Sequence, residues 1–363
     1  MNEIIIRSNK GEYFPGEVIC GVVYLNIENP TSGHGIQLQF KGYEYFFYEY
    51  SCEKGRNKIE STKDYVDCSV SLYSQSDSFA MGSYLFPFKV NLPNIIPGCF
   101  YARRNGSVTW EGKVVYWLEA TVTGADIKSF QDIVIYQCTE DMVANEKLTT
   151  AQNVTHTMKT LLSKKNIDFT VRLMDQVQYV GESARLRMII TNDTNVKVSK
   201  FQIKLFRDLN FTSKSELSAD KLTSNMSSLA RKTYIRAEDG PFVVWKIVGN
   251  NTDSDSVDLV RILDNILIPL KEKSVPIPPS VKGHHIECQY GLEILITLSN
   301  GETVTINHPV PCILPPKNKQ WESWEVPTWV YTGEVVISSS RFSATSSELS
   351  GRGFATLPGF QAL

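Results

Sequence analysis

Few side chains in this sequence are placed where they could do chemistry, and the best candidates are cations. Arg7 and Lys10 lie close together near the start of the sequence, and Arg103 and Arg104 lie next to each other in a segment flanked by aromatic residues. Arginine and lysine suit phosphate groups by charge, and arginine adds bidentate hydrogen bonding. The first pair is therefore a candidate phosphate or partner site, and the second a candidate contact for acidic lipid headgroups or a partner. The alternative for both pairs is ordinary solvated charge.

Patterns typical of the common enzyme classes are absent. The sequence has no Gly-x-Ser-x-Gly, P-loop, dinucleotide-binding or His-Glu-x-x-His motif. His284 and His285 form a compact cluster with Cys288, but adjacent residues on a strand point to opposite faces and cannot easily share a metal ion. Cys52 and Cys68 could face each other across a hairpin, yet neither has the basic surroundings of a reactive thiol. We therefore expect no enzymatic activity, no metal and no cofactor.

Composition narrows the class of protein further. The chain has 363 residues, 42% of them hydrophobic, which is enough for two packed domains. Its 37 basic and 39 acidic residues nearly cancel, so charge gives no reason to expect nucleic-acid binding. Seven scattered cysteines, a start without the apolar run of a secretory signal, and no apolar stretch of about 18 residues favour a cytoplasmic protein with reduced thiols.

Alternation of apolar and polar residues dominates the chain and predicts short strands. Aromatic and β-branched residues are enriched in these segments, and glycine, proline and asparagine separate them. Many short strands with little helix indicate β-sandwich architecture. The expected strands are Val18–Leu25, Ile36–Gly42, Val66–Leu72, Tyr84–Val90, Val114–Thr123, Ser129–Gln137, Phe169–Leu173, Ala184–Thr191, Lys200–Arg207, Phe242–Val248, Glu287–Leu298 and Thr303–Ile306.

Three segments do not follow this alternation. Glu140–Lys165 is polar with weak helical spacing and is interpreted as a connector between domains that includes a short helix; Thr212–Thr233 is interpreted as a helical excursion or a long loop. Near the C-terminus, Trp321, Trp324 and Trp329 would be costly to leave in water. We expect them to pack back on the second domain; a partner-docking segment is the alternative. The serine-rich stretch 338–363 is expected to be disordered and open to phosphorylation.

An internal repeat organises the sequence. Phe14-Pro15-Gly16-Glu17 is matched by Tyr179-Val180-Gly181-Glu182, and the strands that follow align at the same offset. Later, the segment around Tyr116 is echoed by the segment around Tyr290. Because both matches occur in the same order, we interpret the chain as two copies of one sandwich. The expected domains are residues 1–165, residues 166–318 and a tail at 319–363.

These repeated residues carry a resemblance to a known family. Tyr13-Phe14-Pro15-Gly16-Glu17-Val18, Phe86-Pro87-Phe88-Lys89-Val90-Asn91-Leu92-Pro93 and Gly112–Ala120 resemble, in order, motifs of the arrestin superfamily, especially its α-arrestin (arrestin-domain-containing) branch. In the second half, Tyr179–Glu182 with Thr191-Asn192-Asp193-Thr194, and Val310–Pro315, are similar to the motifs of that family's C-terminal domain. The resemblance covers about residues 3–316. It implies an all-β fold of two tandem immunoglobulin-like sandwiches with a flexible C-terminal tail.

The resemblance also implies a function and partners. Proteins of this kind are cytosolic adaptors that bind cytoplasmic tails of membrane proteins for endocytic or endosomal sorting or for signalling, with recruitment to plasma membrane or endosomes. The alternative is a constitutive coat subunit that resembles the arrestin-like subunit of retromer. Sorting or ubiquitination machinery is the implied second partner, although the Pro-Pro-x-Tyr motif that recruits ubiquitin ligases is missing.

Site residues follow from the same resemblance. Arg7 and Lys10 lie in the region where arrestins receive the phosphates of partner tails. Lys159 stands close to the position of an arginine of the arrestin polar core, and the acidic run of the second domain is its implied partner; a plain mobile loop is the alternative for this run, which contains Asp253, Asp255 and Asp258. The segment Tyr101–Trp110, which contains Arg103 and Arg104, departs from the family pattern and is interpreted as an inserted loop.

Overall fold

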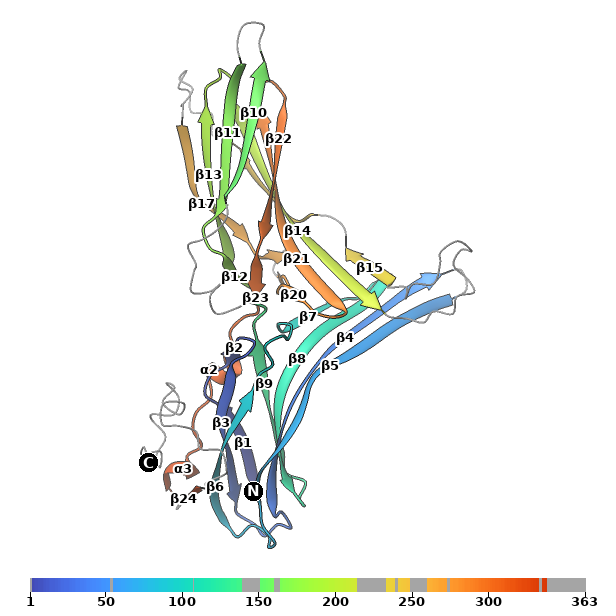
Figure 1. Cartoon of the computed structure of the whole chain (residues 1–363), viewed down its shortest axis with the longest axis vertical. Coiled ribbons are helices and arrows are strands. Elements are labelled where there is room, and N and C mark those ends of the chain that lie inside the picture. Colours follow the sequence, from blue (N-terminus) through green and yellow to red (C-terminus); the bar gives the residue numbers. More distant parts are fainter. Residues whose placement is uncertain are drawn as a thin grey trace. The chain divides into compact units, whose positions relative to one another are not determined.

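The strands of the protein divide between two compact units. The computed structural model describes residues 2–52, 55–106, 108–138, 151–159, 164–213, 233–238, 241–248, 260–272, 275–332 and 335–337. Residues 1–137 and 317–363 form the first unit, and residues 138–316 form the second. Figure 1 labels most strands of both units in chain order. Within the described residues, helix is limited to two single-turn segments that follow Leu314. The prediction of an all-β fold built from two tandem sandwich domains is confirmed.

The first unit consists of two sheets. One has the strand order β1-β3-β6-β24, and the other has the order β2-β9-β8-β4-β5, with β7 paired to β8. Alternate residues of β4 and β8 fill the space between the sheets, where Phe40 stacks on Tyr116 with ring centroids 6.3 Å apart. The elements of this unit are β1 (Glu3–Ser8), β2 (Glu12–Tyr13), β3 (Val18–Ile27), β4 (Gly35–Cys52), β5 (Gly55–Ser74), β6 (Gly82–Asn91), β7 (Phe100–Arg104), β8 (Val108–Thr123), β9 (Lys128–Ile135), α2 (Lys319–Glu322), α3 (Trp329–Thr332) and β24 (Val335–Ile337).

The second unit has the same construction. Its sheets have the orders β10-β11-β13-β17 and β15-β14-β21-β20, with β16 on β14 and β22 on β21; the short pairs β12-β23 and β18-β19 complete it. The alternating burial of β21 and β22 places every second side chain in the core. The strands are β10 (Gln152–Lys159), β11 (Lys164–Leu173), β12 (Val177–Tyr179), β13 (Ser183–Asn192), β14 (Val198–Ser213), β15 (Thr233–Glu238), β16 (Pro241–Val248), β17 (Val260–Pro269), β18 (Lys271–Glu272), β19 (Val275–Pro276), β20 (Val281–Lys282), β21 (Ile286–Leu298), β22 (Thr303–Val310) and β23 (Cys312–Leu314).

The sequence repeat is a repeat of structure. Gly16 and Gly181 both have a positive φ, 85° and 88°, in the turn that leads into a long strand, which explains why glycine occupies both positions. The short strand before each turn pairs in parallel, β2 with β9 and β12 with β23. Tyr116 and Tyr290, which the second match aligned, each donate a hydrogen bond to a proline carbonyl, at 2.9 and 2.7 Å.

Two sequence interpretations are wrong. Residues 152–159 and 164–165 are not part of a helical connector: they belong to β10 and the start of β11, which pair from Gln152 opposite Val171 to Lys159 opposite Lys164. The rest of the predicted connector, residues 140–150 and 160–163, lies outside the described residues. β10 is an edge strand with a solvated face, so it carries polar threonine and asparagine side chains. The sequence therefore lacks the alternation of apolar and polar residues that would predict a strand there. The segment Tyr101–Trp110 is not a loop, because β7 and the first residues of β8 pair as a hairpin. The stretch 214–232 lies outside the described residues.

Candidate functional site

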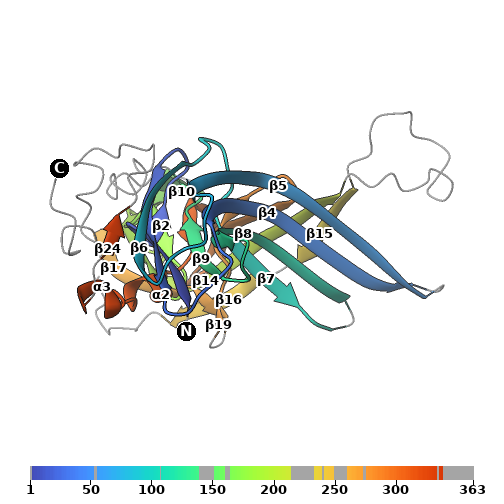
Figure 2. The same ribbon diagram turned by 90° about the horizontal axis from the view of Figure 1, so that it is seen from below.

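The C-terminal segment returns to the first unit and lies on its sheet. We define the C-terminal strap as residues 317–332 and 335–337, which include α2, α3 and β24. Figure 1 shows α3 and β24 beside β6, and Figure 2 shows the same elements from below. Asn318 anchors the first residues of the strap: its backbone N–H donates to Glu12 Oε1 at 2.6 Å and its side-chain amide donates to the Asp132 carbonyl at 3.2 Å. Its Oδ1 accepts from the Trp321 backbone N–H at 3.1 Å and so caps α2.

Arg7, one of the predicted phosphate-binding cations, lies between two indole rings of the strap. Its guanidinium carbon is 4.1 Å from the ring centroid of Trp321 and 4.6 Å from that of Trp324. Both distances are well inside the range of cation–π attraction. Trp321 Nε1 also donates to the Ser8 carbonyl at 3.0 Å, so that the indole both covers Arg7 and satisfies a backbone acceptor of β1.

Burial under the strap changes the electrostatics of Arg7. Desolvation lowers the pKa of its guanidinium to about 10, while the nearby Tyr24 works in the opposite direction. Burial in turn raises the pKa of the Tyr24 phenol, and the Arg7 charge counteracts part of that increase. At neutral pH Arg7 therefore stays charged and Tyr24 stays neutral. Among the described residues, the Tyr24 hydroxyl has no hydrogen-bond partner.

An apolar cluster fixes the middle of the strap. Val22, Tyr24, Leu85 and Val330 form its buried core, with Trp324 and other partly buried side chains packed against it. The Trp324 and Trp329 rings lie 5.7 and 6.3 Å from the Tyr24 ring, and Trp329 Nε1 donates to Glu3 Oε2 at 2.8 Å. The expectation that these tryptophans pack on the second domain is therefore wrong, because their partners are on β1 and β3.

A signal for this arrangement was present in β3. Its sequence, Val-Ile-Cys-Gly-Val-Val-Tyr-Leu-Asn-Ile, has no polar alternation before Asn26, and nine of its ten residues are buried. A strand with apolar residues in both registers is covered on both faces. One face of β3 belongs to the sandwich core, and the strap covers the other.

The end of the strap becomes part of the sheet. β24 pairs in parallel with β6, with Val335 opposite Ser83, Val336 opposite Tyr84 and Ile337 opposite Leu85. β6 would otherwise be the edge of this sheet, since the strand order is β1-β3-β6-β24. The main chain of β6 therefore already accepts an extended segment from a distant part of the sequence.

The other candidate cations do not join Arg7 at the strap. Lys10 Nζ forms an ion pair with Glu17 Oε1 at 2.6 Å and lies 5.0 Å from the Tyr13 ring, so it supports the Gly-Glu turn. Arg103 and Arg104 are exposed on β7, at the end of its hairpin with β8.

The polar core stays a prediction, because its acidic members lie outside the described residues. Lys159 is the last residue of β10, opposite Lys164 in the second unit. Asp253, Asp255 and Asp258 lie outside the described residues, as does the serine-rich stretch 338–363.

The cysteine and histidine candidates show no catalytic arrangement. The hairpin register places Cys52 opposite Gly55 and Cys68 opposite Phe40, so these two cysteines do not face each other. His284 and His285 lie in the turn between β20 and β21, rather than on a strand, with ring centroids 4.6 Å apart. No group of three metal-ligating side chains occurs in the described ranges.

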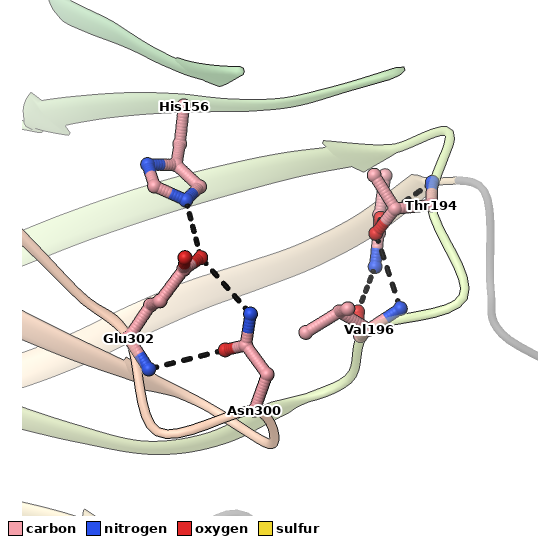
Figure 3. Close-up of polar contacts among 6 residues, drawn as sticks. His156, Thr194, Val196, Asn300 and Glu302 are labelled. Carbon is pink, nitrogen blue, oxygen red and sulfur yellow. Dashed lines mark hydrogen bonds and ion pairs between the residues drawn. The ribbon is translucent and has the colours of Figure 1, made fainter. Parts of the chain in front are cut away.

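A polar network joins β10 to the turn between β21 and β22 of the second unit. Figure 3 shows His156 of β10 reaching toward Glu302, in the turn before β22; His156 Nε2 and Glu302 Oε2 are 3.0 Å apart. Asn300 Nδ2 donates to the same carboxylate oxygen at 2.9 Å. These contacts, the Asn300 amide first and His156 second, lower the pKa of Glu302. The network links β10, an edge of one sheet, to β22, an edge of the other.

Comparison with known proteins gives one consistent result. The family model described as arrestin (or S-antigen), N-terminal domain, matches residues 2–163, and that of the arrestin C-terminal domain matches residues 163–316. The chain is also similar to arrestin domain-containing protein A of Dictyostelium discoideum, with 25% identity over 215 residues. That alignment covers 55% of this chain and 36% of the relative, so the chain spans about a third of the relative's length. In the described ranges no helix is long and apolar enough to cross a membrane.

Proposed function

Because the chain belongs to the arrestin family through both of its domains, we propose that it is a cytoplasmic adaptor for the tails of membrane proteins. Arrestin-family proteins are non-enzymatic adaptors, and the absence of a catalytic constellation among the described residues is compatible with that role. The adaptor couples its cargo to sorting or ubiquitination machinery at the plasma membrane or endosomes. A ubiquitin ligase would be recruited without a Pro-Pro-x-Tyr motif, which this sequence lacks.

One observation carries the proposal: β24 adds to the edge of β6. An extended peptide that adds a strand to a sheet edge gains affinity from main-chain hydrogen bonds and specificity from alternate side chains. The strap is such a peptide within the same chain. A cytoplasmic tail, which is an extended and unstructured segment, has the form that this edge accepts.

The chemistry of the strap indicates which tails would compete with it. Aromatic rings of the strap cover Arg7 and Tyr24, and the acidic residues Glu322 and Glu325 flank Trp324. A competing tail would present aromatic side chains to Tyr24 and a carboxylate or phosphate to Arg7, whose guanidinium favours both anions. In this proposal the strap and the tail bind the same face of the sheet in turn.

The test is affinity purification of the tagged full chain from its native cells, with quantitative mass spectrometry. We expect substoichiometric membrane proteins together with ubiquitin or clathrin machinery. Val336→Pro removes a backbone N–H from β24 and should increase the recovered membrane proteins several-fold. Val336→Ala keeps that N–H and is the matched control. Recovery of coat subunits at one-to-one stoichiometry, unchanged by Val336→Pro, would instead identify a constitutive coat component.

A further inference from the structure

Two aromatic rings and two carboxylates form a row across the larger sheet of the first unit. The row takes one residue from each of four adjacent strands, β9, β8, β4 and β5. Asp132 of β9 is opposite Trp117 of β8, and Asp64 of β5 is opposite Tyr43 of β4. The Trp117 and Tyr43 rings lie 5.7 Å apart in an edge-to-face arrangement. We call these four residues the aromatic–acidic row.

Alternation along the strands places this row on the solvent side of the sheet. Tyr116, which precedes Trp117, is buried in the sandwich core, so Trp117 points to the opposite side. Asp132 and Asp64 are exposed, and Trp117 and Tyr43 are half-buried. Two adjacent aromatic rings with exposed surface on a sheet face are typical of a binding surface.

The charges around the rings favour a cationic ligand. The lysines nearest to the rings already have partners, in the ion pairs Lys41–Glu119 at 3.0 Å and Lys113–Glu111 at 3.9 Å. Within the described ranges, Asp132 and Asp64 have no ion-pair partner. The row is therefore acidic at both ends. Phosphate groups of nucleic acids or of anionic lipids would be repelled there, whereas a basic side chain would be attracted at each end.

The row offers side chains and no free main-chain groups. β8 is paired with β9 and β4, and β4 is paired with β8 and β5, so a ligand that crosses these strands has no ladder to join. A polyproline II segment suits such a surface, because its backbone stays solvated and proline has no N–H to satisfy. Proline-rich segments bind to aromatic side chains in several classes of binding domain.

We propose that the aromatic–acidic row binds a proline-rich segment of a partner protein that has a basic residue on each side of its prolines. Three strand spacings place the two acidic positions roughly 14 Å apart. In a polyproline II helix, two arginines separated by four prolines are about 15 Å apart. The prolines lie on Trp117 and Tyr43, and the arginines form bidentate hydrogen bonds with Asp132 and Asp64.

This surface is separate from the edge of β6 that accepts the strap, because β6 and β24 belong to the other sheet of the unit. The inference therefore does not depend on the proposal for membrane-protein tails. Together, the two surfaces would let one domain hold an extended tail at a sheet edge and a proline-rich protein on a sheet face.

The experiment titrates the full chain into a fluorescently labelled synthetic peptide that has an arginine on each side of four prolines, and measures fluorescence anisotropy. In one control peptide glycine and serine replace the prolines and the arginines are kept. In a second control peptide glutamate replaces the arginines. We expect only the first peptide to bind. Its affinity should fall several-fold when the salt concentration rises from about 0.05 to about 0.5 M, because exposed charges are screened.

Variants of the row test its two components. Trp117→Ala should weaken peptide binding about tenfold or more, whereas Tyr331→Ala, at an exposed aromatic residue of the strap, should leave it unchanged. The double variant Asp64→Asn/Asp132→Asn should weaken binding by a similar factor and flatten its salt dependence. Asp126→Asn, in the turn between β8 and β9, is the matched control. Since the asparagine substitutions are at exposed positions, an unchanged melting temperature shows that the double variant is folded.

Three outcomes would overturn the proposal. Equal binding of the glycine–serine peptide would show attraction of charge alone, without recognition of proline. Binding that survives both Trp117→Ala and the double asparagine variant would place the peptide elsewhere on the chain. Binding of anionic lipid vesicles that is lost in Trp117→Ala would assign this face to a membrane instead. Val336→Pro, which tests the proposal for membrane-protein tails, should leave peptide binding unchanged, so the two proposals fail independently.

Discussion

Arg7 of the first strand lies with its guanidinium 4.1 Å from the ring centroid of Trp321, although the two residues are near opposite ends of the sequence. Arg7 is a cation that the sequence predicts to bind phosphate, and Trp321 belongs to the strap, which was expected to pack on the second domain. A cation expected to face a partner is covered by the chain itself. Whatever binds Arg7 from outside has to replace the indole rings of Trp321 and Trp324.

Replacing Arg7 should weaken the attachment of the strap. Arg7→Ala removes both cation–π contacts from a half-buried site, and we expect a loss of about 1–2 kcal/mol in the free energy of unfolding. Urea denaturation followed by tryptophan fluorescence measures it. A double-mutant cycle with Trp321→Ala should give a coupling energy clearly different from zero; additive effects would show that the stacked geometry contributes nothing.

Trp324 should matter more than exposed aromatic residues of the same strap. Its ring packs on Tyr24 over the apolar cluster, so Trp324→Ala exposes the outer face of β3, at a cost of about 2–3 kcal/mol for a partly buried tryptophan. Binding of a hydrophobic dye to the variant should increase. Tyr331→Ala, at a residue that is 57% exposed, is the matched control and should change stability little. Equal effects of the two substitutions would contradict the packing described for Trp324.

Gly11 allows the start of the strap to approach closely. A Cβ atom at this position would lie 3.1 Å from the Cβ atoms of both Asn318 and Trp321. Gly11→Ala should therefore shift the strap outward and lower the melting temperature of the first unit by a few degrees. Gly291→Ala is the control, because a Cβ atom there would lie 3.8 Å from its nearest neighbour, the His308 carbonyl oxygen. Faster hydrogen exchange at residues 318–322 in Gly11→Ala alone is the expected readout.

Glu302 should make part of the stability depend on pH in the acid range. Its folded-state pKa is lowered by the Asn300 amide and by His156, so the unfolded chain binds a proton more readily. Its contribution is present above the unfolded-state pKa and is lost as the pH falls through the lower, folded-state value. As the pH falls from 7 to 3, the urea midpoint of Glu302→Gln should decrease less steeply than that of the unsubstituted protein. Parallel pH profiles of the two proteins would argue against this network.

Much of the fold follows from local sequence. Period-two alternation identifies the strands of the two sandwiches, and glycine before glutamate marks turns that only a residue tolerant of positive φ occupies easily. The repeat around Gly16 and Gly181 therefore predicts two copies of one structure. Alternation does not predict β10, because an edge strand with a solvated face needs few apolar residues. Its sequence consists largely of threonine, asparagine and other polar residues, which give no strand pattern.

The sequence alone determined that the chain is a pair of β-sandwiches and that both registers of β3 had to be covered. Only the tertiary structure decided what covers them. Burial of apolar surface is non-directional, so the three tryptophans Trp321, Trp324 and Trp329 predict a packed segment without indicating which domain it packs on. The choice depends on contacts between residues far apart in the chain: the indole of Trp321 on Arg7, the hydrogen bond from Trp329 to Glu3, and the parallel ladder of β24 on β6. No local pattern encodes such pairings, because each arises only when the folded sheet brings its partners together.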